Sequence, residues 1–198
     1  PLDNQKFLYE LMRPTPIIEV QKAKDNIKRL DFKILGIVTA DREFMGQNGN
    51  PYGKITLMDY SGSSEFWFFR NDFMKHKSFL SKDYVLIMHG SIEPDREGTR
   101  ARTIYKKIML ATELVPEKVV RSVSVTMRPE ELFNGKQQAL LNVMTEYPGD
   151  SYLMFNFQDP DEDMGVTLVS ENRITYSQEV KQILTEMSVE HHADLKIS

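Results

Sequence analysis

The acidic and histidine side chains are the first candidates for chemistry in this sequence, and they favour structural roles. The densest carboxylate cluster comprises Asp159, Asp161, Glu162 and Asp163. Clustered carboxylates can bind Mg²⁺ or Ca²⁺, or separate their pKa values for acid–base catalysis. Here the spacing does not fit an EF-hand loop, and Pro160 and Gly165 favour a turn between two strands. We therefore expect no metal, no cofactor and no catalytic carboxylate at this position.

The histidines and the missing motifs also favour structural roles over a catalytic or metal site. His191 and His192 are adjacent, so in a strand they point to opposite faces and cannot share a ligand sphere. His76 lies in an amphipathic stretch and His89 in a run typical of strands, where structural roles are expected. The absence of cysteine excludes disulfides, zinc ribbons and thiol nucleophiles. Neither G-x-x-x-x-G-K-[ST] nor G-x-G-x-x-G occurs, so no phosphate-binding loop is predicted.

Aromatic and basic residues carry a stronger signal, that of single-stranded nucleic-acid binding. Rings can stack on bases, and Lys or Arg can pair with phosphates. Alternation along 65–69 sends Trp67 to one face and Phe66 and Phe68 to the other, which we predict to be the core. An alternative is that a neighbouring segment covers Trp67. The predicted nucleic-acid-binding residues are Arg42, Phe44, Tyr52, Lys54, Trp67, Arg70, Arg96, Arg100 and Arg102.

These residues lie in a segment, 32–115, whose short Val-, Ile- and aromatic-rich runs predict strands. Three strands, a helix and two further strands form the element order of an OB-fold, a five-stranded partly open barrel. A generic antiparallel sandwich is the alternative. In mid-strand, Gly36 indicates a bulge or a tight coil. The predicted elements are strands Phe32–Asp41, Tyr52–Asp59 and Ser64–Phe69, helix Asn71–Leu80, and strands Tyr84–Ile92 and Thr103–Leu110.

Two other segments flank the predicted barrel. Residues 1–31 show helical spacing interrupted by Pro14 and Pro16 and are predicted to form a helical connector. Residues 116–198 predict a small α+β domain in the order βαββαβ, a ferredoxin-like arrangement suited to protein docking. Its predicted elements are strand Ser122–Met127, helix Pro129–Tyr147, strands Ser151–Phe157 and Val166–Val169, helix Ser177–Met187 and strand Val189–Ile197.

Charge differs between these segments. Residues 32–115 contain 12 Lys and Arg against 10 Asp and Glu, whereas residues 116–198 contain 7 against 14. An acidic surface repels a phosphate backbone, so the two segments are expected to have different partners. No apolar run long enough for a membrane span and no basic leader occur, which predicts a cytoplasmic protein without membrane contact.

The run GIVTADREFMGQNGNPYGKITLMDYSGSSEFWFF, followed by a helix and YVLIMHGSI, resembles the OB domain of bacterial DNA polymerase III alpha subunits. The family pattern is G-I-V-T, then N-G-x-P-Y, then T-L-x-D-x-S-G-x-x-E. The opening PLD resembles the H-P-L-D stretch before that domain, and VTMRPEEL, YPGDSYLMFNF and RITYS resemble the family's C-terminal domain.

The resemblance implies a noncatalytic C-terminal fragment of a DNA-directed DNA polymerase, a nucleotidyltransferase whose active-site aspartates lie upstream. It implies single-stranded template DNA as the partner of the OB domain, and the clamp-loader tau subunit, with other replicase subunits, as partners of the C-terminal domain. Copies of the family's sliding-clamp motif are poor, because residues 5–11 and 130–133 fit it badly. Family members vary at Lys54 and Trp67, so these two depend on OB geometry alone.

Two other functions remain open at this level. The barrel could be an RNA-binding module, such as the anticodon-binding domain of an aminoacyl-tRNA synthetase. It could also be an OB domain whose binding face contacts only protein.

Overall fold

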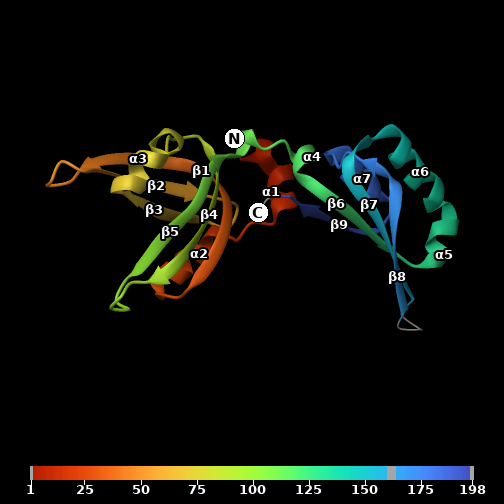
Figure 1. Ribbon diagram of the computed structural model, residues 1–198, viewed down its shortest axis with the longest axis horizontal. Helices are drawn as coiled ribbons and strands as arrows, with labels where there is room; N and C mark the ends of the chain where they lie inside the picture. Colours follow the sequence, from red (N-terminus) through yellow and green to blue (C-terminus); the bar gives the residue numbers. More distant parts are fainter. Residues whose placement is uncertain (1, 160–163, 197–198) are drawn as a thin grey trace. The chain divides into compact units, whose positions relative to one another are not determined.

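The computed structural model describes residues 2–159 and 164–196, which divide into two compact units, 1–113 and 114–198 (Figure 1). Unit 1 begins with the short helices η1 (Asp3–Gln5) and α1 (Lys6–Met12), followed by α2 (Ile17–Asp25). The helical spacing and the proline break predicted for this segment are confirmed. Ile17 and Val20 of α2 are fully buried in the same cluster as the barrel residues, so α2 contributes to the core of unit 1.

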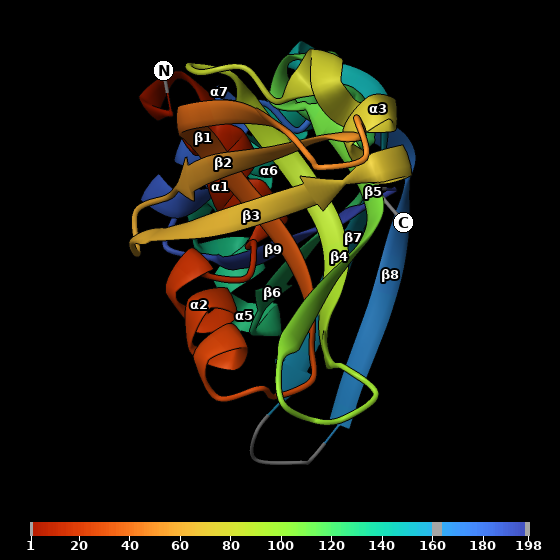
Figure 2. The ribbon, with the colours of Figure 1, turned by 90° about the vertical axis from the view of Figure 1, so that its left-hand side faces the viewer.

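A single five-stranded antiparallel sheet forms the rest of unit 1 (Figure 2). Its strands are β1 (Leu30–Met45), β2 (Pro51–Met58), β3 (Ser63–Phe69), β4 (Val85–Pro94) and β5 (Ala101–Leu110), in the spatial order β3-β2-β1-β4-β5. The helices α3 (Arg70–His76) and η2 (Lys77–Phe79) lie between β3 and β4 in the chain. This is the predicted OB-like order, and one sheet in place of two makes the sandwich alternative wrong.

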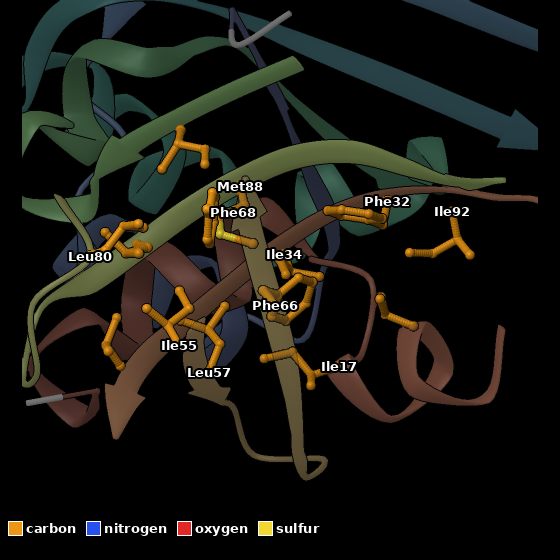
Figure 3. Close-up of a cluster of buried hydrophobic side chains, with 14 of the residues drawn as sticks. Ile17, Phe32, Ile34, Ile55, Leu57, Phe66, Phe68, Leu80, Met88 and Ile92 are labelled. Carbon is orange, nitrogen blue, oxygen red and sulfur yellow. The ribbon is translucent and has the colours of Figure 1, made fainter. Parts of the chain in front are cut away.

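Contacts between the outer strands curl this sheet toward a barrel. The ring of Tyr105 on β5 stacks on Phe68 of β3, with centroids 4.3 Å apart, and its hydroxyl donates to the Trp67 carbonyl at 2.9 Å. Phe66 and Phe68 are fully buried, which confirms them as the core pair of β3 (Figure 3).

Gly36 permits a close approach of backbone and is not the bulge itself. The register of β1 against β2 shifts between Val38 and Ala40. At Gly36 an added Cβ would lie 2.8 Å from the Met58 carbonyl oxygen and 3.0 Å from side-chain atoms of Ile17 and Leu57. Glycine is required at this position because β2 and α2 leave no room for a side chain.

We predict that Gly36→Val lowers the free energy of unfolding of unit 1 by about 1–3 kcal/mol, the range for overpacking a core. Urea denaturation measures the change. Gly165→Val is the matched control, because a Cβ at this strand glycine would meet its nearest neighbour, the Phe157 carbonyl, at an ordinary 3.7 Å. Equal stability of Gly36→Val and the parent protein would contradict the crowding.

A buried carboxylate connects the N-terminal helices to the sheet. Asp59, 6% exposed, follows β2 and accepts hydrogen bonds from the Ile17 N–H at 3.0 Å and the Tyr9 hydroxyl at 3.1 Å. It also accepts from the Ser61 N–H at 2.7 Å, the Ser61 hydroxyl at 2.6 Å and the Gly62 N–H at 3.2 Å. Because Ile17 is the first residue of α2, Asp59 fixes where that helix begins against the barrel.

Asp59→Ala is expected to destabilise unit 1 by about 2 kcal/mol or more, because it leaves the buried Ile17 N–H and several partly buried donors without their acceptor. Thermal and urea unfolding measure the loss. Asp41→Ala removes an exposed carboxylate on β1 and should change stability little. If both variants unfold alike, the network around Asp59 does not hold α2.

Unit 2 contains a four-stranded mixed sheet in the order β8-β7-β6-β9. After η3 (Ala111–Glu113) of unit 1, the elements are α4 (Pro116–Val119), β6 (Val120–Met127), α5 (Pro129–Glu131), η4 (Leu132–Lys136), α6 (Gln137–Glu146), β7 (Pro148–Asp159), β8 (Met164–Ile174), α7 (Gln178–Glu186) and β9 (Glu190–Leu195). The order βαββαβ is confirmed. The helix expected over 129–147 is interrupted, since Asn134 and Gly135 leave helical conformation and Gly135 has φ 90°.

The ferredoxin-like arrangement predicted for residues 116–198 is corrected by the strand order. A ferredoxin-like fold is built on a split βαβ unit, whose two parallel strands have another strand between them. Here β6 and β7 pair directly and in parallel, β8 forms a hairpin with β7, and β9 pairs antiparallel on the other side of β6. Unit 2 is therefore a four-stranded α+β fold of a different strand order.

Candidate nucleic-acid interface

Five of the nine predicted binding residues lie on one outer face of β1, β2 and β3. Phe44 pairs with Tyr52, which pairs on its other side with Phe69, and these three residues form one row across the strands. The next row consists of Arg42, Lys54 and Trp67. Cross-strand partners project from the same face of a sheet, so the register brings aromatic and basic side chains together.

The four rings of these rows form a continuous aromatic patch, defined as Phe44, Tyr52, Trp67 and Phe69. Neighbouring ring centroids are 5.1–6.2 Å apart and their planes differ by 7–26°. Trp67 is 39% exposed and Phe69 57% exposed. The alternative that a neighbouring segment covers Trp67 is therefore wrong. Phe44 and Tyr52 are half-buried, so the exposed rings of Trp67 and Phe69 are the ones on which flat, apolar groups can stack.

Phe69 was missed as a site residue, although the alternation of 65–69 contains the signal that places it beside Trp67. The ion pair between Lys54 and Glu65 was also not predicted from the sequence. Its Nζ lies 2.6 Å from the Glu65 Oε1 atom and 5.2 Å from the centre of the Trp67 ring. A phosphate approaching Lys54 must therefore compete with Glu65 for the ammonium group.

A groove of about 920 Å³ continues from the aromatic patch toward the start of β5. The residues that line it include the aromatic Trp67 and Phe69 and the basic Arg100 and Arg102. Arg96 borders a second hollow of about 420 Å³ that also includes Arg100 and Arg102. Arg70 is exposed at the first position of α3 and is not among the described residues that line either space.

The β4–β5 loop that carries Arg100 is organised by Asp95. The Thr99 and Arg100 N–H groups donate to its Oδ1 atom at 2.8 and 3.2 Å, and the Asp95 N–H donates to the Arg100 carbonyl at 2.8 Å. Desolvation raises the pKa of the Asp95 carboxyl, but the hydrogen bonds from Thr99 and Arg100 outweigh it and the pKa is lowered. The backbone at Arg100 is thus held in one position.

Lys24 of α2, which sequence reasoning missed, also lines the groove. Its Nζ lies 3.6 Å from the centre of the buried Phe66 ring and donates to the Ser64 hydroxyl at 2.8 Å and the Glu65 carbonyl. Burial lowers the pKa of Lys24 to about 8. Lys24 and Tyr105 together occupy two carbonyls of β3, the outermost strand of the sheet, so they protect its edge.

Metal chemistry finds no support in the parts of the chain that the structure describes. No group of three or more His, Cys, Asp or Glu residues there is arranged to hold a metal ion. Asp161, Glu162 and Asp163 of the acidic cluster lie outside the described residues. Within the described ranges, no helix is long and apolar enough to cross a membrane.

Known proteins provide an independent comparison. No family model matches the chain. The chain is similar to DNA polymerase III subunit alpha of Vibrio cholerae, with 24% identity over 195 residues, and of Aquifex aeolicus, with 22% identity over 144 residues. A third relative, from Saccharopolyspora erythraea, is 28% identical over 99 residues and has the same description.

The resemblance to DNA polymerase III alpha subunits is confirmed. These matches cover 96%, 73% and 50% of this chain, but only 16%, 12% and 8% of the respective alpha subunits. The D-x-S-G element quoted for the alpha-subunit pattern is Asp59, Ser61 and Gly62 here, which form the hydrogen-bonded turn beneath α2.

A solved structure of a replication protein A heterotrimer bound to ssDNA was also compared. The superposed part covers 69% of this chain and 34% of the compared chain, with a TM-score of 0.32 and 14% sequence identity. This similarity is too low to establish a shared fold.

The lowered pKa of Lys24 predicts that the stability of unit 1 changes with pH. The folded pKa of Lys24, about 8, lies below the ordinary 10.5, so between these values the unfolded chain binds the proton that the folded chain has released. Stability is therefore reduced below about pH 8 and rises between pH 8 and 10. Tyr9, whose pKa is raised to about 12, retains its proton when folded and lowers stability only above pH 10. Urea titrations across this range should show the rise, and Lys24→Met should remove most of it, leaving a contribution from Lys33, whose pKa is also lowered by burial and by Lys107. A rise that persists in full in Lys24→Met would contradict the assignment to Lys24.

Proposed function

We propose that unit 1 binds single-stranded DNA in DNA replication, as the noncatalytic part of a longer polymerase alpha subunit. The single observation that supports this most is the aromatic patch, four near-parallel rings on the outer face of β1–β3. Every base has a flat face, so stacking on these rings provides affinity without strong sequence preference. OB-folds bind oligonucleotides on the same strands and on the adjoining loops.

Charge supplies the second part of the binding energy in this proposal. Arg42 and Lys54 lie beside the rings, and Arg100 and Arg102 line the same groove as Trp67 and Phe69. Such positions suit a backbone that passes over the patch while its bases stack. Because Glu65 already pairs with Lys54, the electrostatic contribution is modest and salt dependent. Catalysis and cofactor binding are not part of the proposed role, which is exercised in the cytoplasm.

The test uses the intrinsic fluorescence of Trp67, the one tryptophan of the chain. A base stacked on its ring should quench the emission, so titration with oligo-dT reports binding at the proposed face. Parallel titrations with RNA of equal length, at low and high salt, distinguish the RNA-binding alternative, in which RNA binds as well or better. Absence of binding to both would favour a barrel that contacts only protein.

Removing a ring should weaken binding by about 1–3 kcal/mol for each base that loses its stacking partner. We therefore expect Trp67→Ala and Phe69→Ala to bind a fluorescently labelled oligo-dT several-fold to a hundredfold more weakly than the parent protein. Tyr84→Ala is the matched control, because Tyr84 is 42% exposed but lies outside the patch. Trp67→Ala combined with Lys54→Ala should also flatten the salt dependence. Affinity unchanged in this double variant would reject the patch as the site.

Unit 2 is proposed to dock a partner protein, for which the resemblance suggests the tau subunit of the clamp loader within the replicase. Its segment has 7 basic against 14 acidic residues, which disfavours DNA as a ligand. Three large apolar residues of β8, Val166, Leu168 and Val169, are more than half exposed. Exposed apolar residues gathered on one element favour a protein partner.

A further inference from the structure

Strand β8 is an edge of the unit 2 sheet and is long for an edge strand. It runs over Met164–Ile174, 11 residues, and pairs with β7 on one side. The other side of an edge strand presents backbone N–H and C=O groups that can pair with a further strand. Natural edge strands are commonly short, charged or covered, because an apolar edge invites pairing.

The first half of β8 exposes apolar side chains where an edge strand is normally charged, whereas the charged Glu171 and Arg173 lie in its second half. Val166, Leu168 and Val169 are 55%, 52% and 57% exposed. The register places Val166 beside Phe157 and Leu168 beside Phe155, and the two phenylalanine rings are 6.4 Å apart. We call these four residues, Phe155, Phe157, Val166 and Leu168, the β8 ledge.

The β8 ledge continues the buried face of the sheet. Phe155 pairs with Val125 and Phe157 with Met127, and both β6 partners are buried. On this face of the sheet the side chains are buried on β6, half-buried on β7 and exposed on β8. The core of unit 2 is therefore open at its β8 side, where one more strand would extend it.

We propose that the β8 edge accepts an extended segment of a partner protein by strand addition. Resting on the docking role proposed for unit 2, this inference adds the surface and the recognition mode. Backbone hydrogen bonds to β8 align the segment, and every second side chain packs against Val166 and Leu168. The segment is basic as well as apolar, because residues 116–198 carry twice as many acidic as basic side chains.

Charge also argues against a second copy of this chain as the occupant. Two copies paired through β8 would bring two acidic segments together, which opposes association at low salt. A segment that alternates apolar residues with Lys or Arg matches both the apolar ledge and the net negative charge of residues 116–198.

Selection of random peptides displayed on phage tests the recognition mode. The full chain should enrich peptides in which apolar and basic residues alternate. The double variant Val166→Lys/Leu168→Lys should bind the enriched peptides at least about tenfold more weakly. Leu141→Lys is the matched control, because Leu141 is 43% exposed on α6 and outside the ledge. Failure to enrich alternating peptides, or equal binding by the double variant, would overturn the proposal.

A second readout does not depend on the folding of any variant. Methylation of alternate backbone nitrogens of a selected peptide removes the donors needed for strand addition while leaving its side chains intact. We expect binding to the parent protein to be lost with this peptide, and hydrogen exchange of β8 amides to slow only with the unmethylated peptide. Equal affinity of both peptides would mean that the ledge binds without strand addition.

The tau subunit itself separates the two proposals. If tau binds the parent protein and Leu141→Lys but not the double variant, the docking role and the surface both stand. If tau binds all three equally, docking stands and the β8 inference fails. If tau binds none while the alternating peptides still bind, the choice of tau fails and the β8 edge remains the docking surface.

Discussion

The hydrogen bonds to the buried Asp59 carboxylate determine the position of α2, and the candidate DNA-binding groove depends on that position. Burying a carboxylate is costly unless hydrogen bonds compensate for lost water, and here the compensating donors come from α1, α2 and the turn after β2. With α2 fixed, Lys24 reaches the Phe66 ring and the Glu65 carbonyl. One wall of the groove and the protected edge of β3 thus both depend on a single acidic residue.

The aromatic patch depends on a different constraint, the period of two along paired strands. Phe66 and Phe68 must point inward to fill the core, so Trp67 and Phe69 are forced outward beside Tyr52 and Phe44. The tight β1–β2 turn, with Gly49 at φ 72°, sets the register that aligns these rings. A one-residue slip of β3 against β2 would turn the core pair Phe66 and Phe68 outward. Core packing therefore stabilises the same alignment that gathers the rings of the aromatic patch.

Much of unit 1 could be predicted because its signals are local. Alternation located each strand, and Pro14 and Pro16 separated the two helices. What could not be predicted involves residues distant in sequence. Lys24 reaches the groove only through tertiary packing of α2, and the Lys54–Glu65 ion pair requires the β2–β3 register. In unit 2 the order of elements was evident, but direct pairing of β6 with β7 is a choice between sheet orders that no local pattern encodes. Helix propensity over 129–147 likewise concealed the break at Gly135.

The two outer strands β3 and β8 present opposite solutions to the same physical problem. An edge strand exposes unpaired backbone groups, and β3 has two of its carbonyls occupied by Lys24 and Tyr105, while its outward side chains form a surface for stacking. Strand pairing is thereby discouraged at β3, and recognition there must use the sheet face. Along β8 the exposed large apolar side chains are Val166, Leu168 and Val169, which favour the approach of another strand, whereas the charged Glu171 and Arg173 lie further along it. Since an unprotected apolar edge promotes aggregation, the proposed partner strand that covers it gives a reason for its retention. Charge then restricts which strand that is, because only a basic segment gains from the approach.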